Sequence, residues 1–140
     1  DGGQDHIRLQ TIKGKVGYRI VKLQIIGAEP GQQHMEHTVK IYRAEQSTIN
    51  NAINFADSSL LGVAYIQDSA GETYPSSTEV IFDTEVFNQD IYVTHEDTVG
   101  SQPCNYYLEL EVIPLTDSDA EFTTLKDIRG RNTNPGKPSP

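Results

Sequence analysis

The sequence predicts an all-β fold: a single antiparallel β-sandwich or jelly-roll-like domain with flexible N- and C-terminal arms. The chain contains about seven to nine short segments, each about 5–9 residues long, in which apolar and polar residues alternate. Turn-forming residues separate these segments, and strongly amphipathic long helices are missing from the pattern. A length of 140 residues with 36% hydrophobic residues suits one domain with a modest core.

The first half of the domain follows a polar, glycine-rich segment, "DGGQDH" (residues 1–6), which we predict to be a flexible arm. The strands predicted after it cover residues 7–12, 18–26 and 38–43, with a loop over 27–36. On the longest of these strands, Val21, Leu23 and Ile25 share one phase of the alternation, which predicts that they face the core.

The second half begins with an ambiguous stretch, residues 57–66. It fits a strand throughout or a helical turn at 57–61 followed by a strand, and we favour the second. Further strands are predicted at 78–83, 89–95 and 104–113, with a hairpin loop over 96–103 and a short final strand within 121–128. Pro114 should end the last long strand, because proline donates no ladder hydrogen bond.

The domain is therefore expected to span residues 7–128, between the two arms. The last twelve residues, "RGRNTNPGKPSP" (129–140), contain no large apolar side chain and cannot contribute to a core. We predict that they form either a disordered tail or an arm that binds a neighbour in extended form.

The last long strand lies in "CNYYLELEVIPL" (104–115), and its two faces differ. The phase of Tyr106, Leu108, Leu110 and Val112 predicts core, and the opposite phase carries Tyr107, Glu109 and Glu111. Two carboxylates in this spacing lie about 7 Å apart, near the separation in glycosidases. A glycosidase draws its carboxylates from different elements into an aromatic cleft, however, and this chain has no Trp. The outward face is therefore a docking surface or a solvated strand.

Charge is unevenly distributed along the chain, whose formal net charge is −9. No Lys or Arg occurs between Arg43 and Lys126, whereas residues 44–125 carry 15 Asp and Glu. Basic strands lying beside acidic ones would explain this pattern, and so would basic ends that reach an acidic neighbour. The acidic total argues against nucleic-acid binding, and no apolar run is long enough to span a membrane.

Candidate metal sites are weak in the sequence. "HMEH" offers His34, Glu36 and His37, but zinc needs three or four converging ligands, so solvated loop histidines are expected. Three acidic residues at alternate positions could bind calcium or form an exposed acidic turn: Asp117, Asp119 and Glu121. We predict no metal and no cofactor.

Catalytic motifs are equally scarce, and we predict that the chain is not an enzyme. The G-x-S-x-G, P-loop and G-x-G-x-x-G patterns are absent. The single cysteine, Cys104, lacks flanking residues that would activate it, so a small, partly buried thiol is expected. One cysteine also excludes an intrachain disulfide, which suits assembly in a reducing cytoplasm.

Outward tyrosines suggest an interaction surface, because Tyr is enriched at protein interfaces. In the predicted register Tyr42, Tyr92 and Tyr107 all point outward, unless both faces of a central strand are buried. The candidate interface also includes two carboxylates of the last long strand, Glu109 and Glu111. Three basic residues of the C-terminal arm complete it: Arg129, Arg131 and Lys137.

Three runs of the sequence resemble small virion structural proteins of tailed marine bacteriophages. They are "IVKLQIIGAEPG…VKIYR", "INFADSSLLGVAYI" and "EVIFDTEVFNQDIYVTHED…CNYYLELEVI", within residues 18–128. The resemblance implies a non-enzymatic β-fold on the particle, either decorating the head or built into the tail. It carries over no functional residues.

These observations together lead us to expect a capsid decoration (cement) protein, assembled in the host cytoplasm and located on the virion. Its expected partners are the major capsid protein or other virion proteins and further copies of itself, as a dimer or trimer. Charge opposition between basic arms and an acidic neighbour would orient docking. The alternative is a tail or fibre domain that recognises a host surface glycan.

Overall fold

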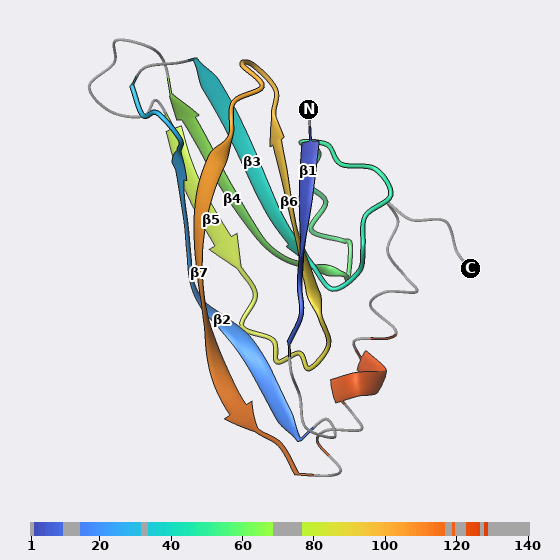
Figure 1. Cartoon of the computed structure of the whole chain (residues 1–140). Helices are drawn as coiled ribbons and strands as arrows, with labels where there is room; N and C mark the ends of the chain where they lie inside the picture. Colours follow the sequence, from blue (N-terminus) through green and yellow to red (C-terminus); the bar gives the residue numbers. More distant parts are fainter. Residues whose placement is uncertain are drawn as a thin grey trace.

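The computed structural model describes residues 2–9, 15–31, 34–68, 77–116, 119, 123–126 and 128, and the following account is limited to them. Seven strands occur in these ranges (Figure 1): β1 (Gly2–Ile7), β2 (Val16–Gly27), β3 (Met35–Tyr42), β4 (Leu60–Asp68), β5 (Ser77–Phe82), β6 (Ile91–Asp97) and β7 (Cys104–Pro114). The predicted all-β sandwich is confirmed. No helix in the described residues has the length and apolar character needed to cross a membrane.

The strands form two sheets in which every pair is antiparallel. The larger sheet has the strand order β1-β6-β3-β4-β5, and the smaller one pairs β2 with β7. Neighbours β3 and β6 are separated by two other strands in sequence, so the larger sheet depends on long-range pairing. Figure 1 shows β2 and β7 lying together in front of the larger sheet.

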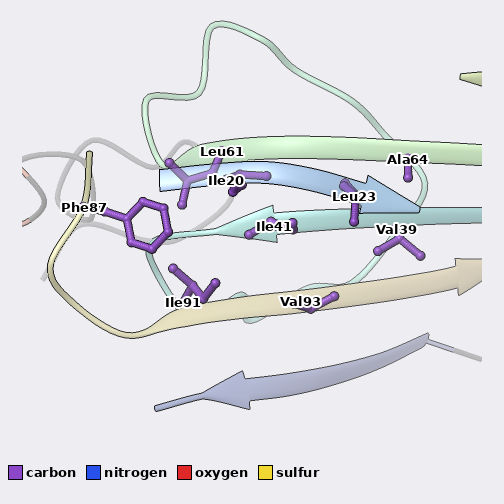
Figure 2. Close-up of a cluster of buried hydrophobic side chains, with 9 residues drawn as sticks. All are labelled: Ile20, Leu23, Val39, Ile41, Leu61, Ala64, Phe87, Ile91 and Val93. Atoms are coloured by element: carbon purple, nitrogen blue, oxygen red, sulfur yellow. The ribbon is translucent and has the colours of Figure 1, made fainter. Parts of the chain in front are cut away.

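The hydrophobic core fills the space between the sheets (Figure 2). Nine buried side chains form it: Ile20, Leu23, Val39, Ile41, Leu61, Ala64, Phe87, Ile91 and Val93. From β7, Tyr106, Leu108 and Leu110 pack against this cluster, as the alternation along that strand predicts. Val112 shares their phase but is 60% exposed, so the prediction that it lies in the core was wrong. Burying these side chains removes apolar surface from water and stabilises the association of the two sheets.

The core face of β2 differs from the predicted one because the strand contains a β-bulge. The register with β7 shifts between Ile20 and Lys22, so Val21 is an extra residue in this strand. Ile20 and Leu23 point into the core, whereas Val21 is 45% exposed. The prediction that Val21 shares the core face of Leu23 was wrong because simple alternation takes no account of an inserted residue.

The predicted N-terminal arm is a strand instead. Residues 2–7 pair with β6 from Gly2 opposite Glu96 to Ile7 opposite Ile91. The Gln4 side chain also exchanges hydrogen bonds with the Gln46 backbone. The segment is short of apolar residues, but backbone hydrogen bonds need no particular side chain, so a polar sequence can occupy a sheet edge.

The chain beyond β7 also differs from the prediction. Residues 123–126 are helical, whereas a short strand was expected within 121–128. Thr123 is buried, and Thr124 accepts a hydrogen bond from the Asn88 amide through its hydroxyl. The C-terminal arm predicted at 129–140 lies outside the described residues.

This helical segment brings Lys126 to a partly buried charge cluster. The Arg43 side chain is only 4% exposed, and its Nη2 lies 2.6 Å from Glu85 Oε2. The Lys126 ammonium contacts the same carboxylate. Burial alone would raise the pKa of Glu85, but hydrogen bonds and charge from Lys126 and Arg43 outweigh it and lower this pKa.

We expect Glu85→Gln to lower the free energy of unfolding by roughly 1–3 kcal/mol at neutral pH, because Arg43 loses a charged acceptor. The lowered pKa means that the Glu85 carboxylate stabilises the fold above its ordinary pKa. This contribution disappears as pH falls through the folded-state pKa. The free energy of unfolding by denaturant, measured at neutral pH and at about pH 3, reports both effects.

The stability gap between wild type and Glu85→Gln should therefore narrow in acid. Glu45→Gln is the matched control, since Glu45 is exposed. An equal loss of stability in the control, or a gap that stays constant with pH, would contradict the assignment.

Candidate functional site

The smaller sheet turns one side away from the core, and we call this side the outer β2–β7 face. Its cross-strand partners are Arg19 with Glu111, Lys22 with Glu109, Gln24 with Tyr107, and Ile26 with Asn105. Arg19 Nη2 lies 2.6 Å from Glu111 Oε1. A basic early strand thus lies beside an acidic late strand, and intramolecular balance accounts for this part of the charge pattern.

One end of the outer β2–β7 face is apolar. Ile26 is 54% exposed and Tyr107 is 53% exposed. The Lys22 ammonium lies 5.7 Å from the centroid of the Tyr107 ring, in cation–π range. Beside these residues is a groove of about 430 Å³, lined by Ile26, Tyr106, Tyr107, Asn105, Gln24 and Val80, among others. This end of the face offers an aromatic ring and an apolar hollow to a partner.

The β7 strand also presents a free edge. Within the part of the chain that the structure describes, β7 pairs with β2 alone over its eleven residues. The opposite edge of the strand therefore presents backbone N–H and C=O groups without a ladder partner. Such an edge can accept a strand from another chain.

The other two candidate tyrosines do not join Tyr107. Tyr42 and Tyr92 are Cα partners on β3 and β6, in the larger sheet. Tyr42 is only 6% exposed, and Tyr92 is partly buried and stacks on His6, with 4.6 Å between ring centroids. The patch of three outward tyrosines is therefore wrong, and the alternative, a central strand with both faces buried, holds for Tyr42 on β3.

The reason is a covering segment, residues 43–59, which lies over part of the larger sheet on the side opposite the core. Lys40 donates to the Ala52 carbonyl at 2.6 Å, which fastens this segment to the sheet. Burial, together with the charge of Asp57, raises the pKa of Tyr42 to about 12. Tyr42 lies on the side of the sheet away from the core, as predicted, but the covering segment shields it from solvent.

Other predicted site residues fall outside the described ranges. These are the three basic residues of the C-terminal arm, Arg129, Arg131 and Lys137, and two of the three possible calcium ligands, Asp117 and Glu121. Asp119 is described, and its backbone N–H donates to the Thr116 hydroxyl at 3.2 Å.

A second cluster lies between the two sheets at the start of β3. We call it the His–Cys cluster: His37 on β3, His95 on β6 and Cys104 on β7. One potential ligand atom from each residue lies within 4.8 Å of the other two. His37 Nδ1 is 2.7 Å from His95 Nε2, and His37 Nε2 is 3.1 Å from the Met35 sulfur. Two imidazoles, a thiol and a thioether therefore converge from both sheets.

Asp97 fastens together the strands that carry this cluster. Its Oδ1 accepts hydrogen bonds from the backbone N–H groups of Glu36, Val99 and Gly100, and its Oδ2 accepts one from Gln102. Burial alone would raise the pKa of Asp97, but these four donors lower it to about 2. The start of β3 and the turn that leads into Cys104 are thus held by one carboxylate.

The cluster is uncharged at neutral pH. Burial and the neighbouring His95 lower the pKa of His37, although Asp97 opposes the shift. Burial also lowers the pKa of His95, and it raises the pKa of the Cys104 thiol to about 11. Nucleophilic cysteines have a lowered pKa, so this thiol is not activated for attack. The prediction of a partly buried thiol is confirmed.

Sequence reasoning grouped the wrong histidines. It considered His34 with His37 in "HMEH", but His34 is exposed, and the partner of His37 is His95, 58 residues away. A usable signal was the strand phase. His37 alternates with Val39, and His95 with Val93, so both histidines share the phase of the core residues.

Comparison with known proteins identifies no relative. No family model, no curated protein and no solved structure matches this chain. Its function is therefore inferred from its own residues.

We expect Asp97→Asn to lower the free energy of unfolding by roughly 1–3 kcal/mol, because the amide presents N–H groups where the carboxylate accepts. Chemical denaturation measures the loss. Asp83→Asn is the matched control, since exposed Asp83 accepts one backbone N–H, that of Glu85. If both substitutions have equal effects, Asp97 is not the fastening point described above.

Proposed function

We propose that this chain is a non-enzymatic structural protein of a phage virion, a capsid decoration protein that docks on the head and stabilises it. The observation that carries the proposal is the apolar end of the outer β2–β7 face, where Tyr107 and Ile26 are each more than half exposed beside a groove. The resemblance of the strand runs to small virion proteins supports the same role.

The chemistry of this face favours docking on a protein. Tyrosine buries a large ring at little entropic cost and is enriched among interface residues that dominate binding energy. Glu111 is already paired with Arg19, so a partner that covers this pair meets a neutralised charge. The free β7 edge could add backbone hydrogen bonds to the contact. The partner in this proposal is the major capsid protein.

A decoration protein would stabilise the head by mass action. A protein that binds only the assembled shell shifts the equilibrium away from opened or dissociated shells. Many copies, each bound across neighbouring shell subunits, would multiply this effect. Two or three copies of the chain could also cluster at one capsid site.

A tail or fibre domain that binds a host glycan is the second candidate. The groove favours it because an aromatic ring, Tyr107, lies beside the amides of Gln24 and Asn105. Aromatic faces and amide groups are suited to the apolar faces and hydroxyls of sugars.

Locating the chain on particles of a phage that encodes it tests the proposal directly. Cryo-electron microscopy and antibody labelling should find many copies on the head lattice. Labelling confined to the tail would overturn the decoration role in favour of the second candidate. Absence from purified particles would overturn both roles.

We expect Tyr107→Ala to weaken binding of the purified chain to capsids about tenfold or more, because a central interface tyrosine is removed. Cosedimentation with capsids that lack the chain measures this affinity. Val112→Ala is the matched control, since Val112 is 60% exposed on the same strand and is not among the groove residues. Equal binding by both variants and wild type would exclude this face as the docking surface.

A further inference from the structure

We propose that the His–Cys cluster is a binding site for a soft transition-metal ion, copper, with His37, His95 and Cys104 as its three donors. This site is separate from the docking surface, and its existence does not depend on the proposed function. The inference rests on the convergence of ligand atoms and on their chemical type.

The convergence comes from three strands that belong to both sheets. His37 and His95 lie on neighbouring strands of the larger sheet, and Cys104 is the first residue of β7 in the smaller sheet. One ligand atom from each lies within 4.8 Å of the others. Ligands that are far apart in sequence but fixed by paired strands form a preorganised site, which limits the entropy lost when an ion binds.

The chemical type of the donors selects the ion. Two imidazoles and one thiolate form the trigonal donor set of blue-copper centres, whereas a structural zinc site takes four protein ligands. The carboxylate of Asp97 is occupied by four backbone N–H groups, so it serves as a support and not as a ligand. Three donors therefore converge among the described residues, which favours copper over zinc.

Hydrogen bonds in the metal-free cluster orient His37 for binding an ion. His37 is fully buried, and its Nε2 faces the Met35 thioether, a weak acceptor. Met35 thus fixes the ring, and the other nitrogen, Nδ1, faces His95 and would bind the ion. Gly27, the Cα partner of Cys104, makes room for Met35 here, because a Cβ atom at Gly27 would collide with the Met35 sulfur.

Binding requires a small rearrangement. His37 Nδ1 and His95 Nε2 are hydrogen-bonded at 2.7 Å, whereas two nitrogens on one ion, each about 2.0 Å from it, lie roughly 3.3 Å apart. The rings must therefore separate by roughly half an ångström. As the bond between sulfur and copper forms, the Cys104 thiol releases its proton to solvent. The ring nitrogen that donates the hydrogen bond between the imidazoles also loses its proton, which moves through solvent to the other nitrogen of the same ring. Both facing nitrogens then bind copper through their lone pairs.

The test uses the purified full chain and copper(I) under anaerobic conditions. Competition with a chromogenic copper(I) chelator should give one ion per chain. Changing groups around a metal costs about 10–100-fold in affinity, so Cys104→Ser and His95→Gln should each weaken copper binding at least about tenfold. His34→Gln is the matched control and should bind like wild type, because His34 lies outside the cluster.

Two outcomes would overturn the proposal. One is the absence of stoichiometric copper binding, and the other is unchanged binding by Cys104→Ser and His95→Gln. A parallel titration with zinc tests the choice of ion, and wild type should prefer copper. A preference for zinc would overturn the copper assignment.

A measurement on wild type alone guards against variants that fail to fold. Cys104 is the only cysteine, so alkylation by iodoacetamide reports on this site alone. Copper(I) should slow alkylation of the folded chain and raise its melting temperature in a concentration-dependent way. Alkylation at the same rate with and without copper would contradict coordination by Cys104.

Discussion

Two strands have to cover a sheet of five, and this shortage of covering surface explains most of the structure. The core is concentrated where β2 lies over β3, β4 and β6, with Phe87 closing one end (Figure 2). Toward the outer strands the cover becomes incomplete. Val80 on β5 is 37% exposed, and on β1 the inward phase holds a carboxylate, Asp5, which accepts a hydrogen bond from the Tyr106 hydroxyl. Polar residues thus occupy inward positions where the apolar layer ends.

On the opposite side of the larger sheet, a segment without regular secondary structure covers part of the sheet. The covering segment (43–59) buries Lys40 and Tyr42 on the side away from the core. Burial lowers the pKa of Lys40, although Asp57 opposes the shift, and its ammonium donates to Ala52 and to the Asn50 side chain. A buried ammonium needs such acceptors, because the loss of water around a charge is costly. The segment is therefore held by polar contacts more than by apolar ones.

The strands themselves were largely predictable, because alternation with period two reports which side of a sheet is buried. Residues 18–26, 78–83 and 104–113 each lie within two residues of the observed strands β2, β5 and β7. The failures have local causes. A bulge at Val21 shifts the phase, and β1 is held by backbone pairing that needs few apolar side chains. Neither is visible in a hydropathy pattern.

The candidate sites were harder to predict for a related reason. Tyr107 was identified correctly as an exposed outward residue, but Tyr42 lies beneath the covering segment, and a strand pattern cannot show what lies above a sheet. The His–Cys cluster depends on which strands are neighbours. The phase of His37 and His95 placed each on a core face, but only the β3–β6 pairing places the two rings together.

The His–Cys cluster lies between the two sheets, and none of its members belongs to the nine-residue apolar core. Its members join β3 and β6 of the larger sheet to β7 of the smaller one, so an ion bound there would link the layers directly. At a free ion concentration 100 times the dissociation constant, binding would stabilise the folded chain by about 2.7 kcal/mol. This is a substantial fraction of the free energy of unfolding of a small domain. Asp97 holds the same strands in register from the adjacent turn. Coordination would then hold the sandwich together at this end, in addition to hydrophobic packing.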